Sequence, residues 1–285
     1  MRVDDLLAAG PTRSFEFFPP SSDGETAVLT ATLADLEGLA PSFVSVTYRG
    51  GEASRQRTFD LVTSIERSGH VSAMAHLICV GHSRGEMRDL LERYLAAGVV
   101  NVMALGGDAT ADPRADASQF AFASELVELA REVGPFCVGV GAHPDTHPRS
   151  PDRASDRRHL ANKLLLADFA LTQFFFEVTQ WVQLVDELAD LNVHKPVVPG
   201  IMPVTSLSGV ARMAQMGAAV PPQLVERLRA ADLRDGPAGG RREGVAAATE
   251  LCRELLEVGV PGLHFYTLNR STATREIHAA LFGES

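Results

Sequence analysis

The chain has 285 residues, of which 45% are hydrophobic and 22% charged, and its formal net charge is −10 at pH 7. This composition suits a globular protein with a large core, and the acidic balance argues against nucleic acid and anionic membrane as partners. Three distant cysteines form neither a disulfide framework nor a zinc motif. With no signal-peptide pattern and no apolar run of about 20 residues, we expect a cytoplasmic protein.

Short apolar runs alternate with helical patterns along the whole chain. The predicted strands are 13–17, 43–48, 72–78, 100–105, 136–141, 170–176, 196–201 and 262–266. The predicted helices are 25–39, 55–67, 84–97, 118–133, 156–166, 179–191, 207–216, 222–231, 243–258 and 273–281. A glycine-rich turn, 235–240, interrupts the helical insert before the last strand.

Strands separated by helices imply parallel crossovers, and eight such units in about 250 residues are typical of a (β/α)8 barrel. We therefore predict one catalytic TIM barrel over residues 1–285, with an extra helix between the last two strands and no regulatory domain. An open doubly wound sheet is the main alternative. The glycine pair Gly139 and Gly141 lacks the third glycine of a dinucleotide fingerprint, which disfavours that alternative.

Glu16 stands in the first predicted strand between Phe15 and Phe17, and Pro19 ends the strand. An ionised carboxylate is seldom buried without a partner, because desolvating its charge costs free energy. Glu16 is thus either a structural residue paired with an arginine or a catalytic acid that its phenylalanine neighbours keep neutral. This stretch alone leaves both interpretations open.

Polar residues stand at or just after seven of the eight predicted strands, where barrel enzymes carry their active sites. They are Glu16, Thr47, His76, Asp108, His143, His147, Gln173, Tyr266, Asn269 and Arg270. Each alone has a structural explanation, such as a turn, a helix cap or a hydrogen-bonded core histidine. Their convergence on one rim favours a functional site.

Other chemistries are less well supported by this rim. Prolines follow both His143 and His147, so the two rings do not share a helix face as zinc ligands often do. A metal-dependent barrel hydrolase stays an alternative, but we expect no metal. Hydrolysis by a serine triad lacks a nucleophile elbow.

Seven stretches, one for each predicted strand except the fifth, together carry a family resemblance. They are 14–20 (Ser-Phe-Glu-Phe-Phe-Pro-Pro), 45–48, 75–77, 104–108 (Ala-Leu-Gly-Gly-Asp), 172–176 (Thr-Gln-Phe-Phe-Phe), 199–204 and 264–270 (His-Phe-Tyr-Thr-Leu-Asn-Arg). In this order they resemble the methylenetetrahydrofolate reductase family. The resemblance implies a barrel enzyme that reduces 5,10-methylenetetrahydrofolate to 5-methyltetrahydrofolate with hydride from NAD(P)H.

The resemblance also implies roles for the rim residues. Glu16 matches the general acid that protonates N10 of the folate, and Asp108 matches an acidic residue that stabilises the resulting cation. Gln173 matches an amide that binds the pterin, and Phe175 is a further substrate contact. Arg270 matches the basic residue expected to bind the glutamate tail. The cofactor-binding residues are then Thr47, His76, Gly107, His143, His147, Asp156 and Lys163.

Several positions depart from the family pattern, among them His143, Gly209 and Met213, and two departures remove a positive charge. Most members bind FAD and have arginine where this chain has Gly106, and a second arginine where it has Asn162. The loss of two cations beside a pyrophosphate weakens flavin binding. We therefore predict NADH in the former flavin region and direct hydride transfer to the folate.

Two alternatives to this prediction remain. In the first, FAD is retained and His143, Arg157 or Arg158 compensates for the missing cations. In the second, the protein is a non-catalytic folate-binding subunit, which the retained Glu16 and Asp108 disfavour.

Overall fold

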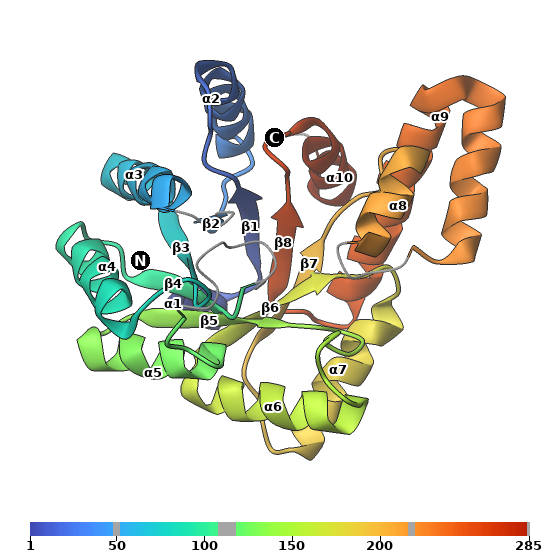
Figure 1. The fold of residues 1–285 in the computed structure, drawn as a ribbon. Helices are drawn as coiled ribbons and strands as arrows, with labels where there is room; N and C mark the ends of the chain where they lie inside the picture. Colours follow the sequence, from blue (N-terminus) through green and yellow to red (C-terminus); the bar gives the residue numbers. More distant parts are fainter. Residues whose placement is uncertain (48–51, 108–117, 216–219, 284–285) are drawn as a thin grey trace.

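The computed structural model describes residues 1–47, 52–107, 118–215 and 220–283. Its strands close into one parallel barrel in sequence order, β1 through β8, with β8 pairing back onto β1 (Figure 1). The predicted (β/α)8 fold is confirmed. The strands are β1 (Thr12–Phe17), β2 (Phe43–Val46), β3 (Ser72–Ile78), β4 (Asn101–Leu105), β5 (Cys137–Ala142), β6 (Phe169–Phe174), β7 (Val197–Ile201) and β8 (Gly262–Tyr266).

Helices surround the barrel and cover the outward faces of the strands (Figure 1). They are α1 (Val3–Ala9), α2 (Asp23–Glu37), α3 (Glu52–Ser68), α4 (Arg84–Ala96), α5 (Ala123–Val133), α6 (Arg153–Leu166), α7 (Val178–Asp190), α8 (Leu207–Gln215), α9 (Pro222–Glu257) and α10 (Thr272–Phe282). The predicted extra helix between β7 and β8 is confirmed, because α8 and α9 both lie there. Among the described helices, none is long and apolar enough to cross a membrane.

The glycine-rich turn predicted at 235–240 is shorter than predicted. Only Gly236 leaves the helical region, with φ 68° and ψ −168°, so the two predicted helices form one long element, α9, with a sharp break. Glycine adopts this positive φ without the steric cost that a Cβ imposes, which lets the chain reverse at a single residue. The two arms of α9 then stand out from the barrel as a helical hairpin (Figure 1).

Most element boundaries differ from the predictions by a few residues, and three of these differences lie near the site. Strand β6 ends at Phe174 instead of residue 176, helix α5 begins at Ala123 instead of residue 118, and α6 begins at Arg153. The N-cap of α6 explains its earlier start, since the Asp152 carboxylate accepts a hydrogen bond of 2.7 Å from the Ser155 amide. Phe175 consequently lies outside the strand in which it was predicted.

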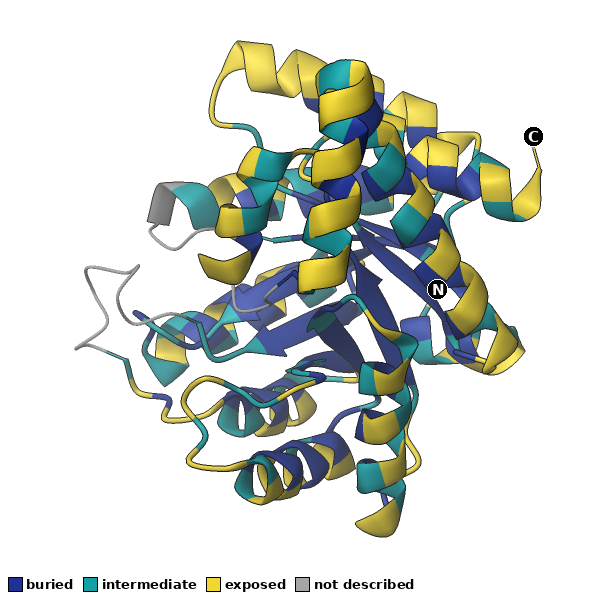
Figure 2. Ribbon diagram, turned by 90° about the vertical axis from the view of Figure 1, so that its right-hand side faces the viewer, coloured by how far each residue is buried: buried dark blue, intermediate teal, exposed yellow. Residues whose placement is uncertain are grey.

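The strands are mostly buried, and exposed residues lie on the outer sides of the helices and in the loops (Figure 2). Successive side chains alternate between the two faces of a strand. On β1, Phe15 and Phe17 pack outward in the core beneath the helices, whereas Ser14 contacts His264 inside the barrel. Glu16 shares the inward face with Ser14 and therefore projects into the barrel.

Helix α1 was not predicted, and it closes the end of the barrel where the strands begin. Val3 and Leu7 pack with inward residues of the strands, including Phe43 and Met103. Asn101 fastens the helix, because its side chain accepts from the Val3 amide at 2.9 Å and donates to the Met1 carbonyl at 2.9 Å. With this end closed, the barrel interior is left open at the opposite end.

Candidate active site

The open end of the barrel leads into a cavity of about 260 Å³. Every strand, or the segment directly after it, contributes to the wall. The lining residues are Glu16, Phe18, Thr47, His76, Met103, Leu105, Gly141, Ala142, His143, Leu171, Gln173, Met202, Tyr266 and Leu268. An apolar wall with a few converging polar groups is typical of a small-molecule site.

A larger cavity of about 430 Å³ lies between β7, the start of α7 and the arms of α9. The one arginine in its wall, Arg227, already pairs with Glu243 at 2.6 Å and with Glu250 at 3.0 Å. The smaller cavity contains buried polar atoms without partners, as described next. We therefore take the smaller cavity as the candidate active site and call it the mouth cavity.

Glu16 lies between two buried histidines. Its Oε2 atom is 3.5 Å from Nε2 of His76 and 3.7 Å from Nε2 of His264, and 11% of its side chain is exposed. Both separations exceed those of good hydrogen bonds, and neither Nε2 atom has a hydrogen-bond partner among the described residues. The structural hypothesis, an arginine partner for Glu16, is not supported by any ion pair in the described part of the chain.

The groups beside Glu16 are neutral or already engaged. Burial lowers the pKa of His76, and burial together with the Glu16 charge raises the pKa of Tyr266 well above its usual value. The Tyr266 hydroxyl donates to the Thr172 carbonyl at 2.6 Å, and Nδ1 of His264 is 2.8 Å from Oγ of Ser14. These contacts fix the surroundings of Glu16 while leaving its carboxyl group available to a ligand in the cavity.

Two glycines make room for this arrangement. Gly200 on β7 has no side chain, and a Cβ there would collide with the Thr172 carbonyl oxygen and the Tyr266 ring. Gly107, after β4, has φ +84°, and a Cβ there would lie 2.2 Å from Cγ2 of Ile78. Larger residues at either position would displace the rim on which the polar groups stand.

The loop between β5 and α6 is held by a buried arginine. The Arg157 guanidinium pairs with Asp156 and Glu187, both at 2.6 Å, and donates to the carbonyls of His143, Pro144 and Asp145. With 3% of its surface exposed, it is committed to the loop. Arg157 therefore does not replace a missing cation of the rim.

Asp156 is the second fastening of this loop. Its carboxylate accepts hydrogen bonds from the His147 amide at 3.2 Å and from the Ser150 hydroxyl at 3.0 Å, in addition to its pair with Arg157. Asp156 is thus directed at its own loop instead of the mouth cavity. Its predicted contribution to cofactor binding would be indirect, because Asp156 fixes the conformation of the loop.

His143 and His147 form an edge-to-face pair on the same loop. Their ring centroids are 4.6 Å apart at an interplanar angle of 71°. Burial and the neighbouring His147 lower the pKa of His143 to about 4, and burial also lowers the pKa of His147. Both rings are uncharged near pH 7, so neither supplies the missing positive charge.

Lys163 is a cation close to this part of the cavity. Its Nζ atom donates to the Gly141 carbonyl at 2.6 Å, and Gly141 lines the cavity. Burial lowers the pKa of Lys163 to about 8, which leaves it mostly charged at pH 7. Lys163 can therefore hold a positive charge beneath the rim.

Comparison with known proteins identifies the family. The family described as Methylenetetrahydrofolate reductase matches residues 2–281. The chain belongs to the methylenetetrahydrofolate reductase family. This result confirms the resemblance found in the sequence.

Individual family members resemble the chain over most of its length. The 5,10-methylenetetrahydrofolate reductases of Pectobacterium carotovorum and Escherichia coli are 32% and 31% identical to it, each over 90% of this chain and 86% of the relative. A solved structure from Clostridium thermocellum, described as binding two copies of 5-methyl-5,6,7,8-tetrahydrofolic acid, superposes with a TM-score of 0.70. It covers 97% of this chain and 96% of its own at 13% identity, which supports the fold alone.

The structure brings five of the predicted site residues together around the mouth cavity: Glu16, Thr47, His76, His143 and Gln173. His147, Asp156 and Lys163 lie beside it in the β5–α6 segment, and Gly107 follows β4. Phe175 is buried beneath the helices and lines the larger cavity, and Arg270 is exposed and does not line the mouth cavity. Asp108 lies outside the described residues.

His264 was not among the predicted rim residues, and Tyr266 was placed at the rim without a role. Both point inward from β8, two residues apart, and the pairing of β8 with β1 sets Tyr266 opposite Glu16 and His264 opposite Ser14. The sequence signal was their alternation with Leu263 and Phe265, which marks the inward face. Their position beside Glu16 follows only from the closed barrel, in which β8 pairs with β1.

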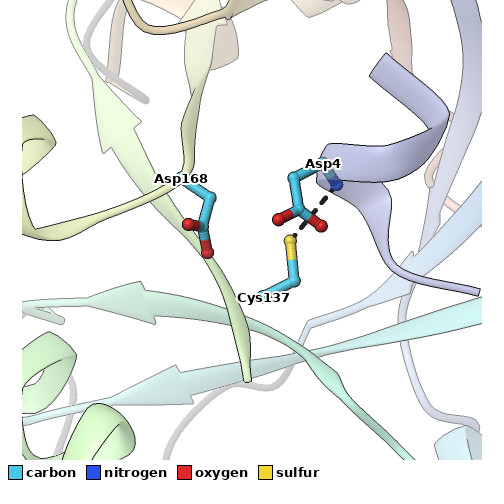
Figure 3. A group of neighbouring side chains, drawn as sticks. All are labelled: Asp4, Cys137 and Asp168. Atoms are coloured by element: carbon cyan, nitrogen blue, oxygen red, sulfur yellow. Dashed lines mark hydrogen bonds between the residues drawn. The ribbon is translucent and has the colours of Figure 1, made fainter. Parts of the chain in front are cut away.

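One group of described residues has donor atoms close enough for a metal ion, and it lies at the closed end of the barrel. Asp4, Cys137 and Asp168 place their donor atoms within 4.8 Å of one another (Figure 3). Arg2 pairs with Asp4 at 2.8 Å, and Arg131 pairs with Asp168 at 2.9 Å. Because arginines already neutralise both carboxylates, and burial raises the pKa of the Cys137 thiol, these atoms are poorly suited to a cation.

Proposed function

We propose that this protein reduces 5,10-methylenetetrahydrofolate to 5-methyltetrahydrofolate with hydride taken directly from NADH. The observation that carries the proposal is Glu16, a nearly buried carboxyl group at the mouth cavity without a cationic partner among the described residues. Membership of the methylenetetrahydrofolate reductase family supplies the reaction class.

The reaction needs one proton and one hydride. The proton passes from the Glu16 carboxyl group to N10 of the folate, the bond between N10 and the methylene carbon breaks, and an iminium cation forms at N5. Hydride from the dihydronicotinamide then adds to the methylene carbon, giving the N5-methyl group and NAD⁺. Glu16 is left as a carboxylate and regains its proton from solvent. A positioned acid of this kind contributes roughly 10²–10⁴-fold.

The site has room for the remaining predicted roles. Gln173 lines the cavity and would bind the pterin through its side-chain amide. Arg270, exposed after β8, would pair with the glutamate carboxylate of the folate. Asp108 would stabilise the iminium cation, and this role rests on the sequence alone. Phe175, in its buried position, would support the pterin pocket from behind.

Direct transfer is favoured over a resident flavin by the charges of the rim. A resident FAD must be held tightly through its pyrophosphate, whereas a nucleotide substrate must leave after each turnover. Near pH 7 the His143 ring is uncharged, and the Arg157 guanidinium is committed to its own loop. Neither can replace the two arginines that this sequence lacks, and Arg149, an arginine at this rim without an ion pair among the described residues, suits a nucleotide that is released after each turnover better than a tightly bound flavin.

Isotope transfer tests the proposal and separates the two routes. Purified protein, without added flavin, should oxidise NADH only when methylenetetrahydrofolate is present. With NADH deuterated at the transferred position of C4, the deuterium should appear in the methyl group of the product. Flavin that co-purifies stoichiometrically and is required for turnover, or deuterium lost to water through an exchangeable flavin N–H, would refute direct transfer. No folate-dependent NADH oxidation with or without FAD would refute the reductase activity.

A further inference from the structure

Arg149 places a guanidinium group at the rim of the mouth cavity. It lies in the loop between β5 and α6, and its Nη2 atom is 3.4 Å from the point that a Cβ atom on Gly106 would occupy. Gly106 directly follows Leu105, which lines the cavity. The absence of a side chain at Gly106 gives the arginine space to cross from the β5 rim to the β4 rim.

The loop holds Arg149 in position from its backbone. The Arg149 amide donates to Nδ1 of His147 at 3.1 Å, and the Ser150 amide donates to the His147 carbonyl at 2.8 Å. The same loop is fastened by Asp156 and Arg157. The direction in which Arg149 leaves the backbone is therefore set by the hydrogen bonds of its loop.

The charge of Arg149 is not neutralised by the described protein. It is exposed and forms no ion pair with any acidic group of the described residues, whereas Arg153 and Arg157 on the same segment both pair with Glu187. The whole chain carries a formal net charge of −10. A free guanidinium at the mouth of a cavity in an acidic protein is suited to an anionic ligand.

We infer that Arg149 binds the pyrophosphate of the pyridine nucleotide as a positioning residue for hydride transfer. This inference rests on the proposed function. A planar guanidinium donates paired hydrogen bonds to phosphate oxygens, and a single such contact suits a nucleotide that must dissociate after each turnover. Lys163 beneath the same rim adds a second positive charge.

The position of Arg149 around the barrel selects the nucleotide over the glutamate tail of the folate. Arg149 follows β5 and approaches the end of β4, whereas Glu16 is on β1 and Arg270 follows β8. In a closed barrel with strands in sequence order, β4 and β5 stand across the barrel from β8 and β1. The two anionic groups would thus be bound at opposite sides of the rim, with the reacting centres between them.

Direct binding measurements on Arg149→Ala test the inference. The dissociation constant of NADH should rise roughly 10- to 100-fold, as expected for loss of a charge-assisted hydrogen-bond pair, and Arg149→Lys should recover part of the loss. Reduced nicotinamide riboside, which has no phosphate, should bind wild type and Arg149→Ala equally. The dissociation constant of 5-methyltetrahydrofolate should not change.

Arg158→Ala is the matched control, because Arg158 is an exposed arginine on α6 that makes its hydrogen bond to Ser155 one turn away. It should bind NADH as wild type does. An NADH affinity unchanged in Arg149→Ala, an equal loss in Arg158→Ala, or a loss confined to the folate would overturn the inference while leaving the reductase proposal intact. Wild-type protein that binds FAD but not NADH would overturn the inference together with the direct hydride route.

Discussion

Both ends of the barrel contain buried or half-buried carboxylates, but the carboxylates at the two ends have different partners. At the closed end, Asp4 and Asp168 are paired with Arg2 and Arg131, and the Asp168 carboxylate also accepts from the Val138 amide at 2.7 Å. At the open end, the groups within ion-pair distance of Glu16 in the described part of the chain are two histidine rings at 3.5 and 3.7 Å.

This difference separates a structural carboxylate from a reactive one. The paired carboxylates hold the chain together, and, against the opposing effect of burial, hydrogen bonding to Arg2 lowers the pKa of Asp4. Glu16 faces a cavity and has no cationic partner among the described residues, so its carboxyl group is available to a ligand. The closed end thus maintains the fold, and the open end keeps its polar atoms for a ligand.

The largest expected effect comes from removing the acid at the open end. Glu16→Gln should lower kcat for folate reduction by roughly 10²–10⁴-fold, because the amide cannot give a proton to N10. NADH binding should be unchanged, since the general acid meets the folate and not the nucleotide. Steady-state kinetics with a parallel NADH titration measures both quantities. Wild-type turnover in this variant would show that Glu16 is not the general acid.

The matching substitution at the closed end should affect stability and leave catalysis alone. Asp168→Asn keeps the shape of the side chain but removes the charge that faces Arg131, and should lower the free energy of unfolding by roughly 1–3 kcal/mol. Its kcat should stay within about twofold of wild type, because changes this far from the reacting groups act independently of them. Urea denaturation and turnover of the same preparation test both parts. Lost turnover with unchanged stability would contradict the division between the two ends.

The smallest expected effect is a pH dependence of nucleotide binding. Lys163 has its pKa lowered to about 8 by burial, so its positive charge is present at pH 7 and largely lost at pH 9. The dissociation constant of NADH should therefore rise with pH by roughly two- to fivefold, the size of a partly exposed charge interaction. Lys163→Arg should abolish this rise, because arginine stays charged.

Lys195→Arg, which changes the only other lysine in the chain, is the control and should keep the wild-type pH profile. An NADH affinity that is independent of pH in wild type would show that Lys163 does not contribute to the nucleotide site. Arg149, whose charge persists over this range, would then account for the anion binding alone.

The barrel was predictable because its signal is repeated and local. Each of the eight strands is a short apolar run followed by a helical pattern, so an error at one boundary does not alter the architecture. The missed features were those with little local signal. Helix α1 has only seven residues and is held by Asn101, far along the chain, and the break at Gly236 depends on one glycine in a longer polar segment.

The candidate site was predictable in position but not in its contacts. Strand ends converge in any barrel, so Glu16, His76, His143 and Gln173 could be assigned to one rim from their places after or within strands. The roles of Asp156 and Arg157 could not, because whether a charged side chain faces a ligand or its own loop depends on the folded path of that loop.

The sequence by itself determined the barrel, the family and the strand on which the reactive carboxyl group stands. Only the tertiary structure decided what surrounds that group. Of Phe15, Phe17 and Phe18, only Phe18 lines the mouth cavity with Glu16. The alternation of β1 turns the other two phenylalanines away from Glu16, so they do not shield it. Its neighbours are instead His76, from β3, and His264 and Tyr266, from β8. They meet Glu16 because the barrel closes in one register, and that register is a property of all eight strands together.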